Sequence, residues 1–375
     1  MFTTKHKKAY VSVINDLSTD ARVRRSCNLL NEMGFDVECI GRKLPNSKPL
    51  DGFEYKTHRM NLVFVTGPLF YFFFNFRLFF YLLFKRKPEL LLANDLDTLL
   101  PNYLISRIKK VPLIYDSHEL FCEVPELANS KFKKNIWQNL EKWIVPKLRY
   151  NITVNKSIAT ILEKSYNVPF SVVRNIPDYK LSLSKKSRQD LGISNDRPML
   201  IYQGAGINID RGVEEMIDAM KYLPEMDFYI IGSGDIWDKL KMQIIESGIT
   251  NVKMLDKMPK EQLVHYTLNA DLGLTLDKDS NLNYKNSLPN KIFDYIHAGI
   301  PVLSSKLHEL EAIIKRYDIG DLIENHRSEH IAHKVRGALD KDAQNKWRKN
   351  LEKAKKELTW DEEKKVFINL VQSIQ

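Results

Sequence analysis

Short apolar runs alternate with longer segments of helical periodicity along nearly the whole chain. In the first half, the apolar runs that read as buried strands lie near 10–14, 37–40, 89–93, 111–115, 152–155 and 170–173. Most segments between them repeat their apolar positions every three to four residues, which is typical of helices that cover a sheet. A second series of strands follows near 199–202, 228–231, 252–255, 272–276 and 302–303. This alternation predicts an α/β fold with doubly wound parallel sheets.

The length of 375 residues favours two domains over a single core. We expect a first domain over 1–178 and a second over 199–355, separated by a polar linker at 179–198 that is rich in Lys, Ser and Asp. Residues 356–375 predict a closing helix, and packing back on the first domain is one arrangement open to it.

The segment 62–84 is unusually aromatic, with ten Phe and Tyr residues between 70 and 84. Its length approaches that of a membrane span, but Gly67 and Pro68 break its start and Arg77 would lie near its middle. We favour an interfacial or buried helix, and a purely structural core helix is the equal alternative. The basic cluster at 85–87 is what a segment lying on an anionic membrane would use.

The stretch 283–305 predicts a capped helix followed by a buried strand. Ser287 is the expected cap, Pro289 suits the first turn, and Gly299 ends the helix. Lys291 at the helix start and Asp294 one turn later would suit a phosphate attached to a ribose. The alternative is an ordinary αβ unit with a surface Lys-Asp pair.

Polar side chains cluster where the strands of the first domain end. Asp20 and Arg22 follow the first strand, Asp95 follows the third, and His118 comes after the fourth. Open parallel sheets place their ligands at this edge. Two simpler roles remain open: Asp20 as a helix cap, and His118 as a buried or capping histidine.

Two glycine pairs follow strands of the second domain. Gly204 and Gly206 come after one strand, and Gly232 and Gly234 after the next. At both places the backbone could approach a phosphate or sugar closely, although each pair alone is weak support. The first strand of the chain is not followed by G-x-G-x-x-G, which weakens a classical dinucleotide site.

The positive charge is concentrated in the first half of the chain, which bears on the kinds of binding partner to expect. The chain has a formal net charge of +10, and residues 1–180 hold 28 Lys and Arg against 17 Asp and Glu. This basic half suits nucleic acid or an anionic membrane, but no nucleic-acid recognition module accompanies it, so we expect no nucleic-acid partner. Three scattered cysteines argue against disulfides and a zinc site and favour a reducing cytoplasm; the start of the chain shows no secretory signal.

In this order, the motifs resemble one known family. The matching pieces are Asp20-Ala21-Arg22-Val23, Tyr115 to Leu120, Gly204 to Gly212, Ile231 to Gly234, Ala270 to Leu274, Pro289 to Tyr295, and Ala298 to Val302. Together they resemble the retaining glycosyltransferases of GT-B architecture, in the group 1 or family 4 set. The resemblance implies two Rossmann-like domains that face a central cleft, with a nucleotide-sugar donor on the second domain and an acceptor on the first.

The resemblance also implies roles in the second domain. Arg211 and Lys291 would neutralise the donor diphosphate, and Asp294 matches the second acid of the E-x7-E motif, which binds the donor ribose. The first acid falls on Asn286, which can hydrogen-bond a sugar hydroxyl but carries no charge. The further donor-binding positions are the four glycines, Ser287, Leu288 and Asn290.

In the first domain, the active-site histidine of the family maps best onto His118. Asp116 and Glu119 are adjacent alternatives, because the match of this short motif could slip. Asp20, Arg22 and Asp95 join them as acceptor-side candidates.

The implied activity is sugar transfer with retention to a saccharide or lipid-linked saccharide, in bacterial surface polysaccharide synthesis. A leaving phosphate oxygen could take the acceptor proton, so no strong protein base is needed, and we expect neither a metal nor another cofactor. The expected location is the cytoplasm, or the inner face of the plasma membrane. A nucleotide-sugar 2-epimerase and a non-catalytic nucleotide-sugar-binding partner subunit are the alternatives.

Overall fold

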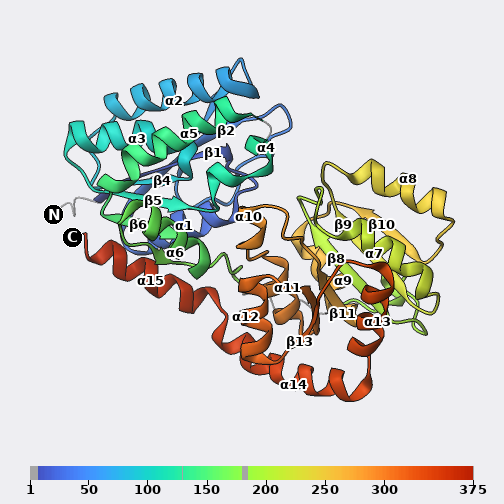
Figure 1. Ribbon diagram of the computed structural model, residues 1–375. Helices are drawn as coiled ribbons and strands as arrows, with labels where there is room; N and C mark the ends of the chain where they lie inside the picture. Colours follow the sequence, from blue (N-terminus) through green and yellow to red (C-terminus); the bar gives the residue numbers. More distant parts are fainter. Residues whose placement is uncertain (1–6, 129, 180–184, 375) are drawn as a thin grey trace. The chain divides into compact units, whose positions relative to one another are not determined.

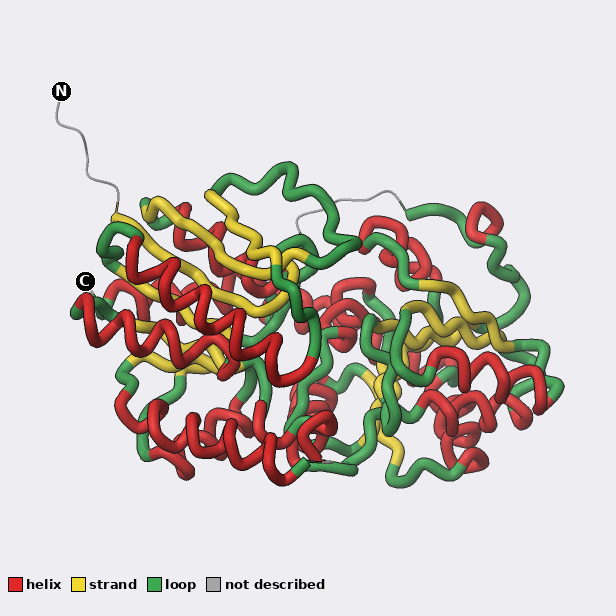
Figure 2. The backbone as a smooth tube through the Cα atoms, turned by 90° about the horizontal axis from the view of Figure 1, so that it is seen from above, coloured by secondary structure: helices red, strands yellow, loops and turns green. Residues whose placement is uncertain are grey.

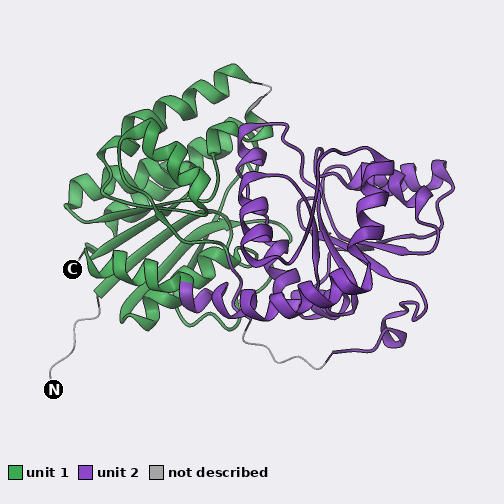
Figure 3. Cartoon of the chain, turned by 60° about the horizontal axis from the view of Figure 1, so that its bottom comes forward, with its two compact units in different colours: residues 1–175, 363–375 green, residues 176–362 purple. Residues whose placement is uncertain are grey.

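The chain forms two compact units, and unit 1 takes residues from both ends of the chain (Figure 3). Unit 1 contains residues up to Asn175 and again from Glu363 onward, and unit 2 runs from Ile176 to Glu362. The computed structural model describes residues 7–128, 130–179 and 185–374. The expected linker therefore belongs to unit 2, and its residues 180–184 lie outside the described part.

Unit 1 is built on a seven-stranded parallel sheet with the order β3-β2-β1-β4-β5-β6-β7 (Figure 1). Its strands are β1 (Lys7–Asp16), β2 (Phe35–Lys43), β3 (Lys56–Asn61), β4 (Leu90–Asn94), β5 (Leu113–Ser117), β6 (Tyr150–Thr153) and β7 (Ser171–Val172). The order reverses beside β1, so the ends of β1, β4 and β5 meet where an open sheet holds its ligands.

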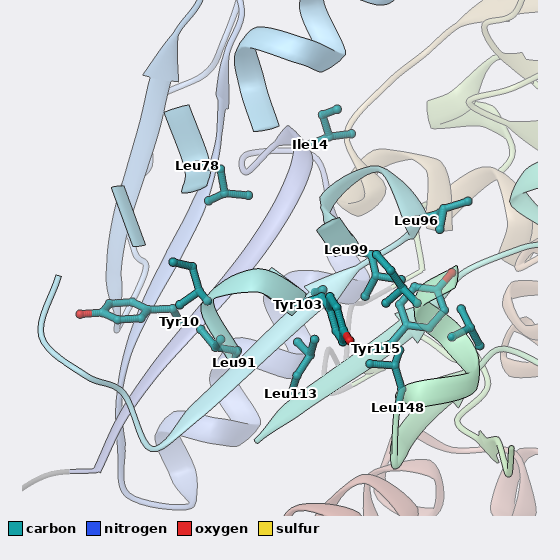
Figure 4. Close-up of a cluster of buried hydrophobic side chains, with 14 of the residues drawn as sticks. Tyr10, Ile14, Leu78, Leu91, Leu96, Leu99, Tyr103, Leu113, Tyr115 and Leu148 are labelled. Carbon is teal, nitrogen blue, oxygen red and sulfur yellow. The ribbon is translucent and has the colours of Figure 1, made fainter. Parts of the chain in front are cut away.

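Helices α2, α3 and α5 cover one face of this sheet, and α1 lies on the other (Figure 1). The helices of unit 1 are α1 (Ala21–Glu32), α2 (Gly67–Phe84), α3 (Leu96–Lys109), α4 (Pro125–Ala128), α5 (Lys131–Ile144), α6 (Lys156–Tyr166), the last part of α15 (Trp360–Gln372), and the 3-10 turns η1 (Phe121–Glu123) and η2 (Val145–Lys147). Between α2, α3 and the strands lies a hydrophobic core whose side chains include Tyr10, Leu78, Leu91, Leu99 and Tyr115 (Figure 4).

Helix α2 is buried on one side only. Phe70, Phe74, Leu78 and Leu82 recur every four residues and are buried in the core. The remaining aromatic residues of the helix are partly or fully exposed. By length and composition alone, α2 is apolar enough to cross a membrane, but its buried stripe is part of the core of unit 1.

Unit 2 has a six-stranded parallel sheet with the order β10-β9-β8-β11-β12-β13. Its strands are β8 (Met199–Gly204), β9 (Asp227–Gly232), β10 (Val252–Asp256), β11 (Leu272–Thr275), β12 (Val302–Ser305) and β13 (Gly320–Ile323). Figure 2 shows the strands of each unit side by side, with helices along them.

The helices of unit 2 pack two buried clusters against this sheet. They are α7 (Val213–Ala219), α8 (Trp237–Ser247), α9 (Lys260–Asn269), α10 (Leu282–Lys285), α11 (Lys291–Ala298), α12 (His308–Tyr317), α13 (Ser328–Ala338), α14 (Lys341–Glu357), the start of α15, and the turns η3 (Gln189–Leu191) and η4 (Met220–Tyr222). The predicted fold class, two doubly wound parallel sheets, is confirmed.

Two details of the sequence analysis are wrong. The edge strands β3 and β13 were not among the predicted strands, because β3 carries mostly polar side chains and β13 is only four residues long. Ser287 does not cap the helix that contains Lys291: α11 begins at Lys291 with Asn290 in the cap position, whereas the Ser287 hydroxyl donates to the Tyr284 carbonyl at 2.9 Å, at the end of α10. Gly299 does end α11, with a φ of +74°.

Candidate functional site

In unit 1, His118 lies between two aspartates at the carboxyl ends of β4 and β5. Its Nδ1 is 3.1 Å from the Asp95 carboxylate and its Nε2 is 3.5 Å from the Asp116 carboxylate. The backbone NH of His118 also donates to Asp95 Oδ1 at 2.8 Å. Asp95 has a φ of +60°, a conformation that is rare outside glycine and clusters at functional sites.

Arg22 anchors the same cluster from helix α1. Its Nε and Nη2 donate to the two carboxylate oxygens of Asp116 at 3.0 and 2.7 Å, and its Nη1 donates to the Val173 carbonyl at 2.9 Å. Both side chains of this pair are buried. These three bonds of Arg22 are all internal, which makes it a positioning residue for Asp116 rather than a group that contacts an acceptor.

These contacts decide the charges of the cluster. Burial by itself would raise the pKa of Asp116, but Arg22 and His118 hold it well below its usual range. Burial would lower the pKa of His118, but Asp95 and Asp116 raise it well above its usual value. His118 is therefore an imidazolium at neutral pH, suited to donating hydrogen bonds and stabilising negative charge.

Asp97 belongs to this cluster, although the sequence analysis did not select it. Its side chain is buried, and burial together with the charge of Asp95 raises its pKa well above the usual value. Within the described residues, its Oδ1 has no hydrogen-bond partner. The only signal in the sequence was its place in the polar run 94–97 after a buried strand.

Asp20 and Glu119 form hydrogen bonds with residues that are close to them in the sequence. Asp20 caps α1, because its Oδ1 accepts from the Val23 NH at 3.1 Å, so the simpler of the two roles considered above is confirmed. The backbone carbonyl of Glu119 accepts from the Phe121 NH and the Ser117 hydroxyl, both at 2.9 Å. The charge of Glu119 adds to the raised pKa of Asp97, so the residue lies close to the cluster.

In unit 2, two cations lie near one buried carboxylate, and only Arg211 is paired with it. Arg211 donates to Asp277 Oδ1 at 2.8 Å and stacks over the Tyr284 ring at 4.0 Å. Lys291 Nζ lies 3.5 Å from the centre of the Tyr202 ring. No carboxylate of the described chain lies within 4.0 Å of Lys291 Nζ.

Burial lowers the pKa of Lys291 to about 7, against a raising effect of Asp277, and the nearby Arg211 charge lowers it further. Lys291 is the first residue of α11, and the NH groups of Ile292 and Phe293 in this turn donate to the Pro289 and Asn290 carbonyls at 3.2 and 3.0 Å. Asp277 was missed by the sequence analysis, although a carboxylate directly after a buried strand was the signal used elsewhere in the chain. The site therefore has a surplus of positive potential suited to an anion.

Asp294 also lies in unit 2, one turn after Lys291, and is held by neighbours. Tyr179 Oη donates to one carboxylate oxygen at 2.6 Å, and Gln203 Nε2 donates to the other at 2.9 Å. Lys260 Nζ is 3.7 Å away, and the Tyr179 ring stacks on His297 at 3.9 Å. A ligand hydroxyl that binds Asp294 would join or displace these partners.

Comparisons with known proteins identify the family of the chain. Residues 184–358 match the sequence model of the glycosyl transferases group 1, and residues 21–178 match that of glycosyltransferase family 4. The chain belongs to the glycosyltransferases of the group 1 / family 4 type. No curated protein matches it.

Solved structures show the same GT-B fold at low sequence identity. Sucrose-phosphate synthase from Thermosynechococcus elongatus is 14% identical, with a TM-score of 0.79 over 98% of this chain and 99% of that one. The Anabaena protein HepE, in complex with UDP-glucose, is 16% identical, with a TM-score of 0.74 over 98% and 99%. WaaG, a glycosyltransferase involved in lipopolysaccharide biosynthesis, is 15% identical, with a TM-score of 0.70 over 96% and 99%.

Within this glycosyltransferase, the two glycine pairs differ in the space around them. A Cβ on Gly232 would lie 1.8 Å from the Gly204 carbonyl oxygen, and one on Gly234 would lie 2.1 Å from the Ile207 carbonyl oxygen. These two glycines let neighbouring loops pack backbone to backbone. A Cβ on Gly204 would have Lys291 Nζ at 4.0 Å, and one on Gly206 would meet no atom closer than 4.0 Å, so only this first pair leaves room beside the cations.

The segment before α11 contains Asn286, which the sequence analysis matched to the first acid of the E-x7-E motif. Asn286 stands at the first acidic position and ends α10, where its side-chain amide donates to the Leu282 carbonyl at 2.8 Å. Leu288 packs against a hydrophobic cluster, and the Asn290 carbonyl accepts from the Phe293 NH at 3.0 Å. Within residues 7–128, 130–179 and 185–374, no group of three or more His, Cys, Asp or Glu could hold a metal ion.

Proposed function

We propose that this glycosyltransferase moves a sugar, with retention, from a nucleotide-sugar donor to a saccharide or lipid-linked saccharide acceptor. Bacterial surface polysaccharide synthesis is the setting we infer, in keeping with the similarity to WaaG. The donor would bind unit 2, and unit 1 would supply His118 and the acceptor site. UDP-sugars are the first donors to test, because HepE was crystallised with UDP-glucose.

One observation carries the proposal: Lys291 is desolvated and has no carboxylate within 4.0 Å among the described residues, while Arg211 is paired with Asp277. Such an arrangement is costly for the free protein and is relieved when an anion arrives. A donor diphosphate matches it in charge, and the open Gly204–Gly206 loop leaves space beside Lys291.

The mechanism we infer is substitution at the anomeric carbon on the face from which the diphosphate departs. The acceptor oxygen forms the new bond to that carbon, the bond to the diphosphate oxygen breaks, and the acceptor proton passes to a diphosphate oxygen. Lys291 and Arg211 would neutralise the departing charge. His118 is an imidazolium between Asp95 and Asp116, which fits a stabilising role better than that of a base.

A donor screen tests this function. We expect one or more nucleotide sugars to raise the melting temperature of the protein and to release nucleoside diphosphate slowly. Lys291→Met should weaken donor binding by about 100-fold, the order of 2.7 kcal/mol for a buried charge-assisted contact. Lys285→Met is the matched control, because Lys285 is exposed on the neighbouring helix α10 and pairs with Asp279.

The pH dependence gives a second readout. An anion beside Lys291 raises its pKa again, so donor binding takes up a proton when the pH lies above about 7. Affinity should fall with rising pH, by at most about tenfold per unit. Calorimetry in buffers of different ionisation enthalpy measures the proton directly, and no uptake at pH 8 would contradict the role of Lys291.

A non-catalytic nucleotide-sugar-binding subunit is the second candidate, favoured by the uncharged Asn286 at the usual acidic position. The donor screen separates the two functions. Binding with neither hydrolysis nor transfer would favour the subunit, whereas turnover that is lost in His118→Ala would favour the enzyme.

A further inference from the structure

Helix α2 carries a continuous row of exposed apolar side chains. We call this row the α2 ridge; it consists of Leu69, Phe72, Phe73, Phe76, Phe80 and Phe84, which are between 38% and 82% exposed. Successive rings lie 6.0 Å apart for Phe72 and Phe76, 4.8 Å for Phe76 and Phe80, and 6.1 Å for Phe80 and Phe84. Large apolar patches of this kind mark interaction sites.

The opposite side of α2 fixes how the ridge can be used. Phe70, Phe74, Leu78 and Leu82 are at most 3% exposed and belong to the core between α2, α3 and the sheet. A helix that crossed a bilayer would have to withdraw this stripe from the core. In the folded unit, α2 can therefore lie on a partner but cannot be surrounded by one.

Cations outnumber acids around the ridge, although three of them are paired: Lys56 with Asp36, Arg59 with Asp16 and Lys85 with Glu38. Residues 55–88 contain no Asp or Glu and six cations: Lys56, Arg59, Arg77, Lys85, Arg86 and Lys87. Arg86 and Lys87 are exposed at the end of α2 and have no carboxylate within ion-pair distance among the described residues. An open groove of about 460 Å³ runs beside them, lined by Phe76, Arg77, Phe80, Tyr81, Phe84 and Lys85.

Helix α5, which contacts α2, also carries exposed aromatic and basic side chains. Tyr71 of α2 and Trp137 of α5 are in ring contact at 5.3 Å. Residues 131–147 contain five Lys, and their single acid, Glu141, is buried. Phe132 and Trp143 of α5 are exposed, with Lys147 over the Trp143 ring at 4.8 Å.

We propose that the α2 ridge rests in the interfacial layer of an anionic membrane, with α2 parallel to the surface and the flanking lysines and arginines on lipid phosphates. Aromatic side chains flanked by cations suit the boundary between acyl chains and headgroups. A second copy of the chain is a poorer occupant, because it would bring the exposed cations Arg86 and Lys87 of one copy against those of the other. This inference concerns binding and does not depend on the proposed sugar transfer.

Sedimentation with vesicles tests the ridge. We expect the full chain to bind vesicles of phosphatidylcholine mixed with phosphatidylglycerol, and to bind pure phosphatidylcholine far less. The variant Phe72→Ser/Phe76→Ser/Phe80→Ser should lose at least about tenfold in partition coefficient, because three large apolar groups no longer enter the interface. Ile209→Ser/Met242→Ser/Ile245→Ser is the matched control, since these unit 2 residues are equally exposed, and it should bind as the wild type does.

A charge variant tests the second half of the proposal. Arg86→Gln/Lys87→Gln should weaken binding about fivefold per residue, whereas Lys239→Gln/Lys241→Gln on α8 should not. Circular dichroism must show the same melting temperature for variants and wild type. Equal binding to neutral vesicles, full binding by the ridge variant, or a wild-type dimer that the ridge variant converts to a monomer would overturn the proposal.

Discussion

The two charged clusters differ in how their cations are balanced. In unit 1, Arg22 and His118 are matched by Asp95 and Asp116 through contacts of 2.7 to 3.5 Å. In unit 2, Arg211 has Asp277, but Lys291 has only the face of Tyr202. Cations that are paired with carboxylates are held in fixed positions, whereas a buried cation without a carboxylate partner favours the binding of an anion. The first cluster is therefore preorganised, and the second is ready for a ligand.

Removing the carboxylate partner of Arg22 in unit 1 should have the largest effect on the free energy of unfolding. Asp116→Ala leaves the buried Arg22 guanidinium without its carboxylate, and we expect a loss of about 3–5 kcal/mol in the free energy of unfolding. Urea denaturation followed by circular dichroism measures the loss. Lys221→Ala, which removes an exposed ion pair with Asp218, is the control and should change stability by less than about 1 kcal/mol. A loss of that small size in Asp116→Ala would contradict the anchoring role.

In unit 2, the loops beside the cations also pack backbone to backbone. Gly232→Ala would force a Cβ to within 1.8 Å of the Gly204 carbonyl, so we expect a loss of about 3 kcal/mol. Gly206→Ala meets open space and should cost less than about 1 kcal/mol. Thermal unfolding of both variants checks the contrast, and equal losses would refute it.

The two clusters should respond to pH in opposite directions. The folded-state pKa of Lys291 is about 7, below its unfolded value of about 10.4, so the unfolded chain binds more protons between these values and stability rises with pH there. The folded-state pKa of His118 is raised, so its contribution is fully present below about pH 6.5 and is lost as the pH rises through the folded value.

Unfolding free energies measured from pH 6 to 9 would separate the two residues, with slopes of at most about 1.4 kcal/mol per pH unit. Lys291→Met should remove the rising component and His118→Gln the falling one. If either substitution leaves the pH profile unchanged, the charge state assigned to that residue is wrong.

Lys291→Met should have the smallest effect on stability. Removing a desolvated cation and keeping the volume should leave stability within about 1 kcal/mol of the wild type or raise it. Combined with the large loss of donor binding expected above, this would show that Lys291 serves a ligand. A strong destabilisation would instead place Lys291 among the groups that hold unit 2 together.

The sequence predicted the fold well because alternating strands and helices carry a strong periodic signal. It also selected His118 and Lys291, which occupy a strand end and a helix start that local rules can recognise, whereas Arg211 was selected through the family resemblance. It could not predict long-range partners: Arg22 and Asp116 are 94 residues apart, and nothing local marks them as a pair. For the same reason, it could not show that Tyr179 and Gln203 hold Asp294. The residues are readable from the sequence, but their charge states depend on contacts that only the folded chain makes.

The chain passes between its two units twice, and this affects how the protein is synthesised. Arg174 pairs with Glu363, whose carboxylate accepts hydrogen bonds from the Arg174 backbone NH at 2.6 Å and from its Nε at 2.8 Å. These partners are 189 residues apart, with all of unit 2 translated between them. During translation, unit 1 therefore lacks its C-terminal helical segment until unit 2 has been synthesised. The Arg174–Glu363 contact can form only when the end of the chain has been made.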